Sequence, residues 1–297
     1  MARSQLLLLL ALVPLACRAA AAPEPLRIGV MTDCQYADKD DAGARKYRQS
    51  PRKLAEALER FDQLDPDWLL HLGDFIDEGQ ASFEPLLELC RGSDLRVHHV
   101  LGNHDFSVED RFKEQVPGLL GMPARYHAWR SKGWRLVVLD GNDLSLHGHP
   151  EDSELQRESR AYYERLDPRP PTYSGAVGPQ QLAWLEAELG AADAAGEAAI
   201  LLCHFPALGA DGHRLWNGEE VLAVIDRHPS VVAWLNGHDH AGGHVERKGV
   251  HHLTFRGMVD TDENAFALVE LEPGRLRVRG FGREPDRELV LRGVAPK

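Results

Sequence analysis

Leucine-rich and β-branched runs recur along the amino-terminal two thirds of the chain, and most of them stop just before a short polar turn. Short runs that are apolar on both faces are typical of parallel strands buried between helices. The strands predicted on this basis cover residues 26–32, 68–72, 97–101, 134–139, 199–203 and 231–235. Apolar residues at helical spacing predict helices over residues 83–89 and 219–226. Pro51 and Pro179 begin two further predicted helices, because proline is favoured in the first helical turn.

After residue 240 the pattern changes to an alternation of apolar and polar positions, which is typical of antiparallel strands with one buried face. Such runs lie near residues 251–255, 265–271 and 275–280. Together, the buried runs and the alternating runs predict an α/β fold. In it, two mixed sheets pack on each other and helices cover their outer faces.

Five turns in this arrangement carry side chains that can bind metal ions. They are Asp33-Cys34-Gln35, Gly73-Asp74, Gly102-Asn103-His104-Asp105, Cys203-His204 and Gly237-His238-Asp239-His240. Because α/β sheets build their sites at the carboxyl ends of strands, we expect these turns to meet. A single His-x-His motif is more often a surface loop than a metal site. Carboxylate, amide and imidazole donors from five turns, however, form a ligand set for two divalent cations.

The same turns resemble the motifs of the calcineurin-like metallophosphoesterases: Asp-x-His, Gly-Asp-x-x-Asp, Gly-Asn-His-Asp/Glu, a lone His and Gly-His-x-His. Their order is the same here, except that Gln35 stands where the family has its first histidine, and the likeness runs from about residue 27 to about residue 260. The resemblance implies a four-layer αββα sandwich. It also implies one metal site of Asp33, Gln35 and His240, a second of Asn103, His204 and His238, and a shared ligand, Asp74.

His104 lies inside the Gly-Asn-His-Asp motif but matches no metal ligand of the family. The resemblance implies that it stabilises developing charge or protonates the leaving oxygen. Asp77 matches the carboxylate that orients this histidine, and fixing an imidazole is a common task for a carboxylate. The alternative for Asp77 is an ordinary turn residue before Gly79.

This donor set suits the hydrolysis of phosphate esters and anhydrides. Two cations about 3.5–4 Å apart can bind the phosphoryl oxygens, lower the pKa of a bound water and direct it at phosphorus. The oxygen donor of Gln35 favours manganese or magnesium over zinc at its site, while magnesium, iron and zinc remain alternatives to manganese overall. We therefore expect a hydrolase with two divalent metal ions.

A narrower resemblance concerns the substrate. Residues 28–38 and the segments Leu215-Trp216-Asn217 and Gly242-Gly243 are similar to the manganese-dependent ADP-ribose/CDP-alcohol diphosphatases. The likeness implies hydrolysis of the diphosphate linkage of such nucleotides. Because the loop 39–50 lacks the aromatic residues expected to stack on a base, the base would be held by a lid or by Tyr36 and Trp216. The alternatives are a general phosphomonoesterase or phosphodiesterase and, less favoured because the ligand set is complete, a non-catalytic scaffold.

Length and charge agree with this interpretation. Residues 23–297 can form one large domain, and residues 141–178 form a long insertion that we expect to act as a lid. His147, His149, Tyr162, Tyr163 and Tyr173 lie in that insertion. The formal net charge of −12 argues against a duplex nucleic-acid partner but permits a small anionic nucleotide, because bound cations dominate the local field. The oligomeric state stays open.

The amino terminus has the composition of a secretory signal peptide over residues 1–22: Arg3, an apolar run from residue 6 to 15, and small residues before Pro23. The run is shorter than the roughly 20 residues of a membrane span. We therefore expect an exported protein, periplasmic or secreted, with lipidation at Cys17 as the less favoured alternative. Three further cysteines form no disulfide framework.

Overall fold

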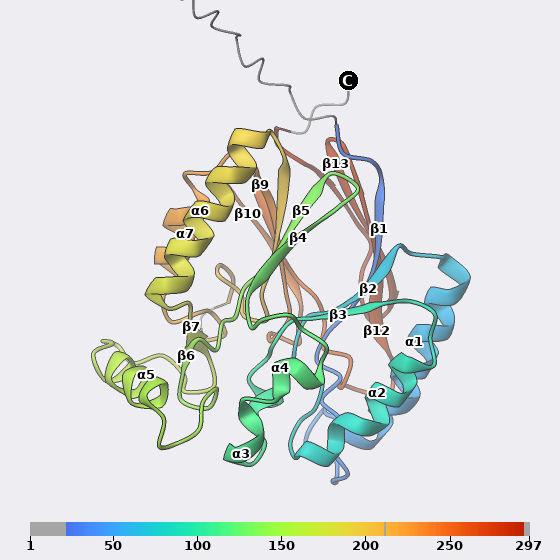
Figure 1. Cartoon of the computed structure of the whole chain (residues 1–297). Coiled ribbons are helices and arrows are strands. Elements are labelled where there is room, and N and C mark those ends of the chain that lie inside the picture. The colour runs from blue at the N-terminus through green and yellow to red at the C-terminus, as the bar shows by residue number, and fades with distance from the viewer. Residues whose placement is uncertain (1–21, 211, 294–297) are drawn as a thin grey trace, which may run out of the picture.

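The computed structural model describes residues 22–210 and 212–293. Within them two six-stranded mixed sheets lie face to face (Figure 1). Residues 1–21 of the expected signal peptide, including Cys17, lie outside the described residues. No described helix is long and apolar enough to cross a membrane.

The first sheet has the order β14-β13-β12-β1-β2-β3. Its three parallel strands are β1 (Leu26–Met31), β2 (Trp68–His71) and β3 (Val97–His99). Three antiparallel strands complete it: β12 (Ala265–Glu272), β13 (Arg275–Gly282) and β14 (Arg287–Val290). The parallel strands all end at the same edge, where the turns with the candidate ligands begin.

The second sheet has the order β10-β11-β9-β8-β5-β4. Its strands are β4 (His127–Ser131), β5 (Trp134–Val138), β8 (Ala198–Leu202), β9 (Val231–Asn236), β10 (Gly243–Arg247) and β11 (Val250–Thr254). One expectation was wrong here. The run predicted near residues 251–255 as an antiparallel strand is β11, which pairs in parallel with β9 and is antiparallel only to β10.

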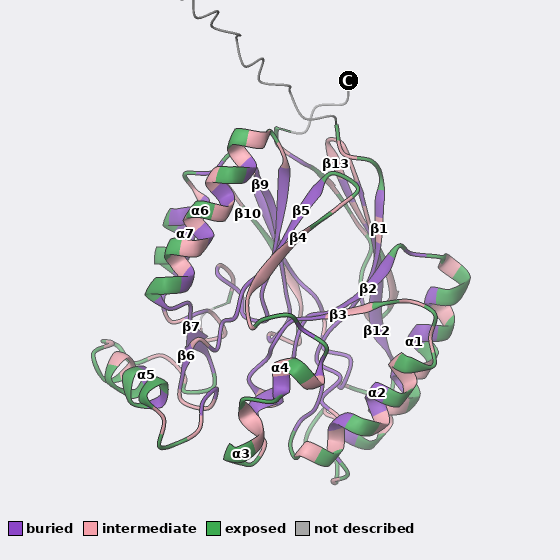
Figure 2. Ribbon diagram, in the orientation of Figure 1, coloured by how far each residue is buried: buried purple, intermediate pink, exposed green. Residues whose placement is uncertain are grey.

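Helices cover both outer faces. On the first sheet these are α1 (Ser50–Leu64) and α2 (Phe83–Arg91), and on the second α6 (Pro179–Ala195) and α7 (Gly218–Ile225). The central strands are buried, the edge strands β4, β10 and β14 are partly exposed, and the helices combine buried and exposed residues (Figure 2). Both sheets are therefore covered on both faces, and the predicted four-layer αββα sandwich is confirmed.

Strand β8 shows why the sequence reads as a continuous apolar run. Ile200 and Leu202 belong to the apolar cluster between the two sheets, whereas Ala199 and Leu201 belong to the cluster beneath α6 and α7. Alternate side chains of a strand point to opposite faces, so a strand covered on both faces needs apolar residues at every position. All five residues of this strand are buried.

The expected lid, residues 141–178, contains the two-stranded ribbon of β6 (Leu144–Ser145) and β7 (Gly175–Ala176) and the helix α5 (Glu154–Glu164). Ser153 caps α5, because its hydroxyl oxygen accepts a hydrogen bond from the main-chain nitrogen of Gln156 at 3.0 Å. The short helices α3 (Asp110–Lys113) and α4 (Val116–Leu119) follow β3. A movement of the insertion stays a prediction.

Candidate binuclear metal centre and active site

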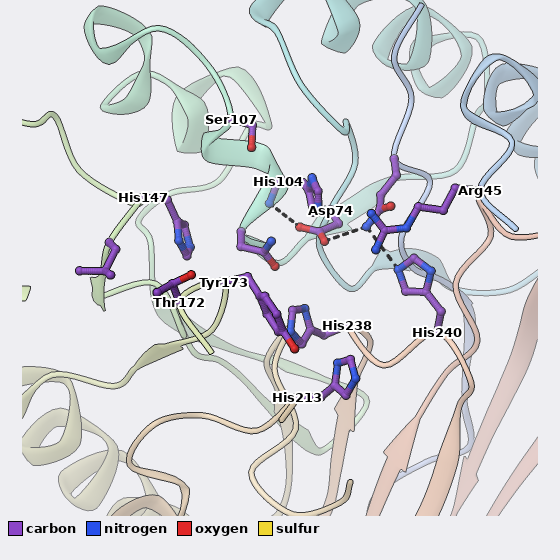
Figure 3. Close-up of a pocket in the computed structure, with 13 residues that line it drawn as sticks. Arg45, Asp74, His104, Ser107, His147, Thr172, Tyr173, His213, His238 and His240 are labelled. Atoms are coloured by element: carbon purple, nitrogen blue, oxygen red, sulfur yellow. Dashed lines mark hydrogen bonds between the residues drawn. The ribbon is translucent and has the colours of Figure 1, made fainter. Parts of the chain in front are cut away.

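A cavity of about 650 Å³ opens where the carboxyl ends of the parallel strands of both sheets meet. Five of the predicted ligands line it: Gln35, Asp74, Asn103, His238 and His240. In Figure 3, Asp74, His238 and His240 line the same cavity, and Arg45 lies beside His240. The expectation that turns far apart in the sequence meet at one edge is therefore confirmed.

The residues predicted for the first metal lie close together. His240 Nε2 is 3.2 Å from Asp33 Oδ1, and Gln35 Nε2 is 3.3 Å from His240 Nε2. Gln35 Nε2 also donates to Asp74 Oδ2 at 3.1 Å. Asp33 and Gln35 are almost completely buried. This group therefore places two oxygen donors and one imidazole at one end of the site.

The second group lies on the other side of Asp74. His204 Nε2 is 3.2 Å from Asp74 Oδ2 and 3.2 Å from His238 Nδ1, and one donor atom from each of these three residues falls within 4.8 Å of the others. Asn103 lines the same cavity. Since Asp74 contacts members of both groups, its position is that of a shared ligand.

Several donor atoms in this site have no partner within the described part of the chain. Asp33 Oδ1, Gln35 Oε1, Asn103 Oδ1 and His238 Nε2 are buried and form no hydrogen bond. A buried polar atom without a partner costs about 1–3 kcal/mol, so a group of four in one place is unfavourable unless a ligand completes it. These residues therefore fit two divalent cations, whose oxygen and imidazole donors they would supply.

The main chain is strained where these donors stand. Asp33, Gln35, Asp74 and His238 have φ angles of 51°, 44°, 57° and 68°. The left-handed region costs a non-glycine residue about 1–3 kcal/mol and is found mostly at functional sites. Neighbouring loops hold it: Asp33 N donates to Gly73 O and Gln35 N donates to Asp74 O, each at 3.0 Å.

Asp105 ties two of the turns together. Its carboxylate accepts hydrogen bonds from the main-chain nitrogens of Asp74 at 3.1 Å, Phe75 at 2.8 Å and Gly102 at 2.8 Å. Burial raises the pKa of Asp105 to about 7, the charge of Asp74 adds to this, and the hydrogen bonds from Gly102 and Phe75 oppose it. In the sequence Asp105 is only the last residue of the Gly-Asn-His-Asp motif, and this bracing role was missed.

The carboxylates attract positive charge into the site. Burial by itself would lower the pKa of His204, yet Asp74 raises it to about 9. Burial would also lower the pKa of His240, but the carboxylates of Asp33 and Asp260 outweigh this effect and raise the pKa to about 10. The field that favours imidazolium ions here also favours metal cations, and binding a metal would displace those protons.

Two histidines predicted as metal ligands, His204 and His240, are oriented through their second ring nitrogen. His204 Nδ1 donates to Leu72 O at 2.8 Å, and His240 Nδ1 donates to Asp260 Oδ1 at 3.1 Å. In each ring Nε2 is thereby directed at a carboxylate of the site, which is the arrangement that metal-binding histidines need. Asp260 could not be predicted from the sequence, because His240 lies 20 residues away from it and no motif joins the two.

His104 and Asp77 are neighbours, as predicted, but their contact differs from the expectation. His104 Nδ1 donates to the main-chain oxygen of Asp77 at 3.0 Å and is 3.4 Å from its carboxylate Oδ1. The other carboxylate oxygen of Asp77 accepts from Lys39. His104 therefore keeps Nε2 available on the cavity side, while Lys39 was not anticipated as a partner.

The insertion supplies one side of the cavity through Leu146, His147, Thr172 and Tyr173, while Arg45 and His213 come from other loops. The Tyr173 ring lies 5.5 Å from the His238 ring, and its side chain is largely exposed. Of the five candidate residues in the insertion, only His147 and Tyr173 line the cavity. His149, Tyr162 and Tyr163 do not.

Tyr36 and Trp216, expected as alternatives for holding a base, do not line the cavity either. The Trp216 indole donates to Pro171 O at 3.0 Å and its ring packs against Tyr163 at 4.9 Å. Trp216 thus anchors the insertion to the body of the protein. That role depends on where the chain returns after α5, which the local sequence does not specify.

The profile of the calcineurin-like phosphoesterases matches residues 26–242, which is more than two thirds of the chain and includes every predicted ligand. The chain belongs to this family. Its relatives include the manganese-dependent ADP-ribose/CDP-alcohol diphosphatases of Mus musculus and Bos taurus. They are 32% and 31% identical, over 90% and 89% of this chain and 94% of each relative.

A solved structure, the dimetal phosphatase from Danio rerio, has a TM-score of 0.81 to this phosphoesterase at 27% identity and covers 89% of this chain and 98% of that chain. The predicted family and fold are confirmed. This calcineurin-like phosphoesterase is an enzyme that uses two divalent metal ions to hydrolyse phosphoester bonds. The roles of single residues stay predictions, which the distances above support.

Proposed function

We propose that this phosphoesterase is a manganese-dependent diphosphatase that cleaves the diphosphate linkage of ADP-ribose or CDP-alcohol type nucleotides. The observation that carries the proposal is the near full-length similarity to relatives of that name. Gln35 supplies an oxygen where the family has an imidazole, and oxygen donors favour manganese over zinc.

The cavity is compatible with such a substrate. Its volume of about 650 Å³ lies within the range of small-molecule sites, and a nucleotide diphosphate is larger than a simple phosphate monoester. Arg45 lies beside Gln35 and His240, where its guanidinium can bind a phosphate oxygen in a bidentate manner (Figure 3). Tyr173 on the opposite side offers an aromatic face to a base or sugar.

Roles follow from position. Asp33, Gln35 and His240 would hold one cation, Asn103, His204 and His238 the other, and Asp74 both. Bound there, two cations would supply charge neutralisation and a water of lowered pKa. His104, fixed through Nδ1 by Asp77, donates a proton from Nε2 to the departing phosphate oxygen as the bond from phosphorus to that oxygen breaks. The products are a nucleoside monophosphate and a phosphorylated alcohol or sugar.

The test is a substrate panel with the full chain and manganese. We expect kcat/KM for ADP-ribose and CDP-glycerol to exceed that for cyclic AMP, because a phosphomonoester is a better leaving group than an alcohol. We expect it to exceed that for p-nitrophenyl phosphate because the cavity of about 650 Å³ can also hold the rest of the nucleotide. His104→Ala is the matched control, and it must lower all activities together if one site performs them. A preference for the monoester would leave a general phosphatase, and a preference for cyclic AMP a phosphodiesterase.

We also infer that the protein is exported, with residues 1–22 as the signal peptide. In support, a residue just after this segment is part of the fold: Glu24 N donates to Lys132 O and the Trp134 indole donates to Glu24 O, both at 2.8 Å. Fractionation of a bacterial host that expresses the full chain, with amino-terminal sequencing, checks this. An uncleaved cytoplasmic protein would contradict export, and palmitate incorporation would favour Cys17 lipidation.

A further inference from the structure

One segment beside the metal centre is held by several cationic side chains in addition to main-chain hydrogen bonds. All seven main-chain carbonyl oxygens from Gly257 to Glu263 accept hydrogen bonds from lysine or arginine side chains. Arg283 donates to Gly257 and Glu263, Arg52 donates to Asp262 at 3.3 Å, and Lys53 donates to the four carbonyls between them. We call residues 257–263 the clamped segment.

Lys53 has the central place in this arrangement. Its Nζ lies 2.8, 3.4, 3.2 and 2.6 Å from the carbonyl oxygens of Met258, Val259, Asp260 and Thr261. The side chain projects from α1 and its exposed fraction is 0%. None of these four acceptors is a carboxylate. Carbonyl oxygens that surround a desolvated cation in this way resemble the coordination of a monovalent metal ion.

Such a cation is expensive to bury. Burial, together with the charges of Arg283 and Arg52, lowers the pKa of Lys53 to about 8, although the charges of Asp260 and Asp262 oppose this. A surface lysine on α1 would avoid this cost, and an apolar residue would remove a donor from four carbonyls, of which Val259 O keeps the hydrogen bond from Lys46 N. The chain nevertheless keeps the buried ammonium of Lys53. The contacts of residues 257–263 show which part of the site this ammonium affects.

The clamped segment contacts the first predicted metal site and the residue before it at four points. Met258 N donates to Thr32 O at 3.0 Å, and Val259 N donates to Asp33 O at 2.9 Å. Asp260 Oδ1 accepts from His240 Nδ1 at 3.1 Å. Gly257 lies against the His240 ring, since a Cβ there would be 2.7 Å from His240 Cγ.

Among the described residues, the second predicted site has no hydrogen bond to this segment, and its link is indirect, since His238 N donates to Asp33 Oδ2 at 3.2 Å. His204 donates through Nδ1 to Leu72 O at 2.8 Å, and His238 Nδ1 faces His204. Whatever orders the clamped segment should therefore act on one metal site and leave the other nearly unchanged.

We propose that Lys53 is a positioning residue for the metal site of Asp33, Gln35 and His240: its ammonium replaces a bound monovalent cation, fixes the clamped segment and so aims Asp260 at His240. This rests on the proposed use of two metal ions. His240 then presents Nε2 to the cation because Asp260 holds Nδ1, and loss of such an outer partner typically weakens metal affinity 10–100-fold.

The experiment measures manganese binding rather than activity. Metal-depleted full chain is titrated with Mn²⁺, and free Mn²⁺ is followed by electron paramagnetic resonance. Wild type should bind two ions. Lys53→Met, which keeps the length and removes the charge, should bind one ion as wild type does and the other 10–100-fold more weakly.

Asp260→Ala gives the same test without touching the buried ammonium, so it applies even if Lys53→Met folds poorly. It should weaken the same single site, and the double variant should be no weaker than the worse single variant, because both act through His240. In Lys53→Ala, butylammonium should restore tight binding of the ion whose affinity the variant weakens, whereas butanol should not.

Arg135→Met is the matched control for loss of a buried charge. Arg135 is 3% exposed and pairs with Glu188 and Glu197 behind the second sheet, far along the chain from every predicted ligand. It should lower the melting temperature and leave both manganese affinities unchanged. Unchanged binding in Lys53→Met or Asp260→Ala, or equal weakening of both sites, would overturn the role of Lys53. Failure of wild type to bind two ions would instead refute the proposed function on which it rests.

Discussion

Gly102→Ala tests whether the shared position of Asp74 is what the site depends on. A Cβ at residue 102 would lie 2.1 Å from Asp74 Oδ1, 2.3 Å from Asp74 N and 2.8 Å from Asp74 Cγ. Ordinary contacts of a Cβ are 3.4 Å or more, so the carboxylate has to move by more than about 1 Å. Rotation of the side chain alone does not relieve the clash, because the main-chain nitrogen is equally close.

The expected effect is on metal binding and catalysis more than on folding. A displacement of about 1 Å in a catalytic array costs about 10²-fold in rate. Moving the one carboxylate that contacts both groups should also weaken manganese binding about 10-fold or more. Overpacking in a tight loop costs about 1–3 kcal/mol of stability, which a stable domain survives. We therefore expect a folded protein with kcat/KM for ADP-ribose lowered at least about 100-fold and with reduced manganese content.

Gly190→Ala is the control, because nothing lies within 4 Å of a Cβ at that position in the middle of α6. Alanine there should add about 0.5–1 kcal/mol of stability and leave activity unchanged. Melting temperature, manganese stoichiometry and kcat/KM are measured on both variants. If Gly102→Ala lost stability but kept its manganese and turnover, the close approach to Asp74 would be a packing detail and the reasoning would be refuted.

Three further outcomes are expected. Asp74→Asn should lose manganese and nearly all turnover, which metal analysis and kinetics would show; near-normal activity contradicts a shared carboxylate. His104→Ala should keep both metals and lose about 10²–10⁴ in turnover, whereas a collapse of metal content would make His104 a ligand. Burial would raise the pKa of Asp193, but hydrogen bonds from Ser230 and His228 outweigh this effect and lower it. Its stabilisation is therefore complete above pH 3.8 and lost as pH falls through the lowered pKa. Asp193→Asn should cost about 1–2 kcal/mol at pH 7 in urea unfolding, with no difference from wild type remaining in strong acid.

Much of the site could be predicted from the sequence because it lies where strands end. Apolar runs that stop before Asp33, Asp74 and His204 place these side chains at one edge, since parallel strands share their direction. The resemblance added an order of motifs that packing does not require. Position and motif together brought seven candidate ligands to one place.

Contacts between distant segments could not be predicted in the same way. Trp216 was expected near a base and instead holds the insertion through Pro171. The run near residue 251 alternates like an antiparallel strand, yet β11 is parallel to β9 because the chain crosses over before pairing. Lys53 reaches carbonyls more than 200 residues away, and although Leu54, Ala57 and Phe61 place position 53 on the buried face of α1, nothing in the helix shows what its ammonium would bind. In each case the deciding partner comes from the tertiary arrangement.

The strain at the metal centre shows how these two kinds of information combine. Four residues of the predicted ligand set have left-handed main-chain angles, at a cost of about 1–3 kcal/mol each, and a short motif does not show what holds them. Asp105 braces the turns of Asp74 and Gly102 through three N–H groups, and the clamped segment braces the turn of Asp33 from the other side. The donors therefore point inward because two buried side chains, Asp105 and Lys53 of α1, fix the main chain of the turns around them. The motifs determine which atoms can bind metal, and Asp105 and Lys53 determine that those atoms are already in place when it arrives.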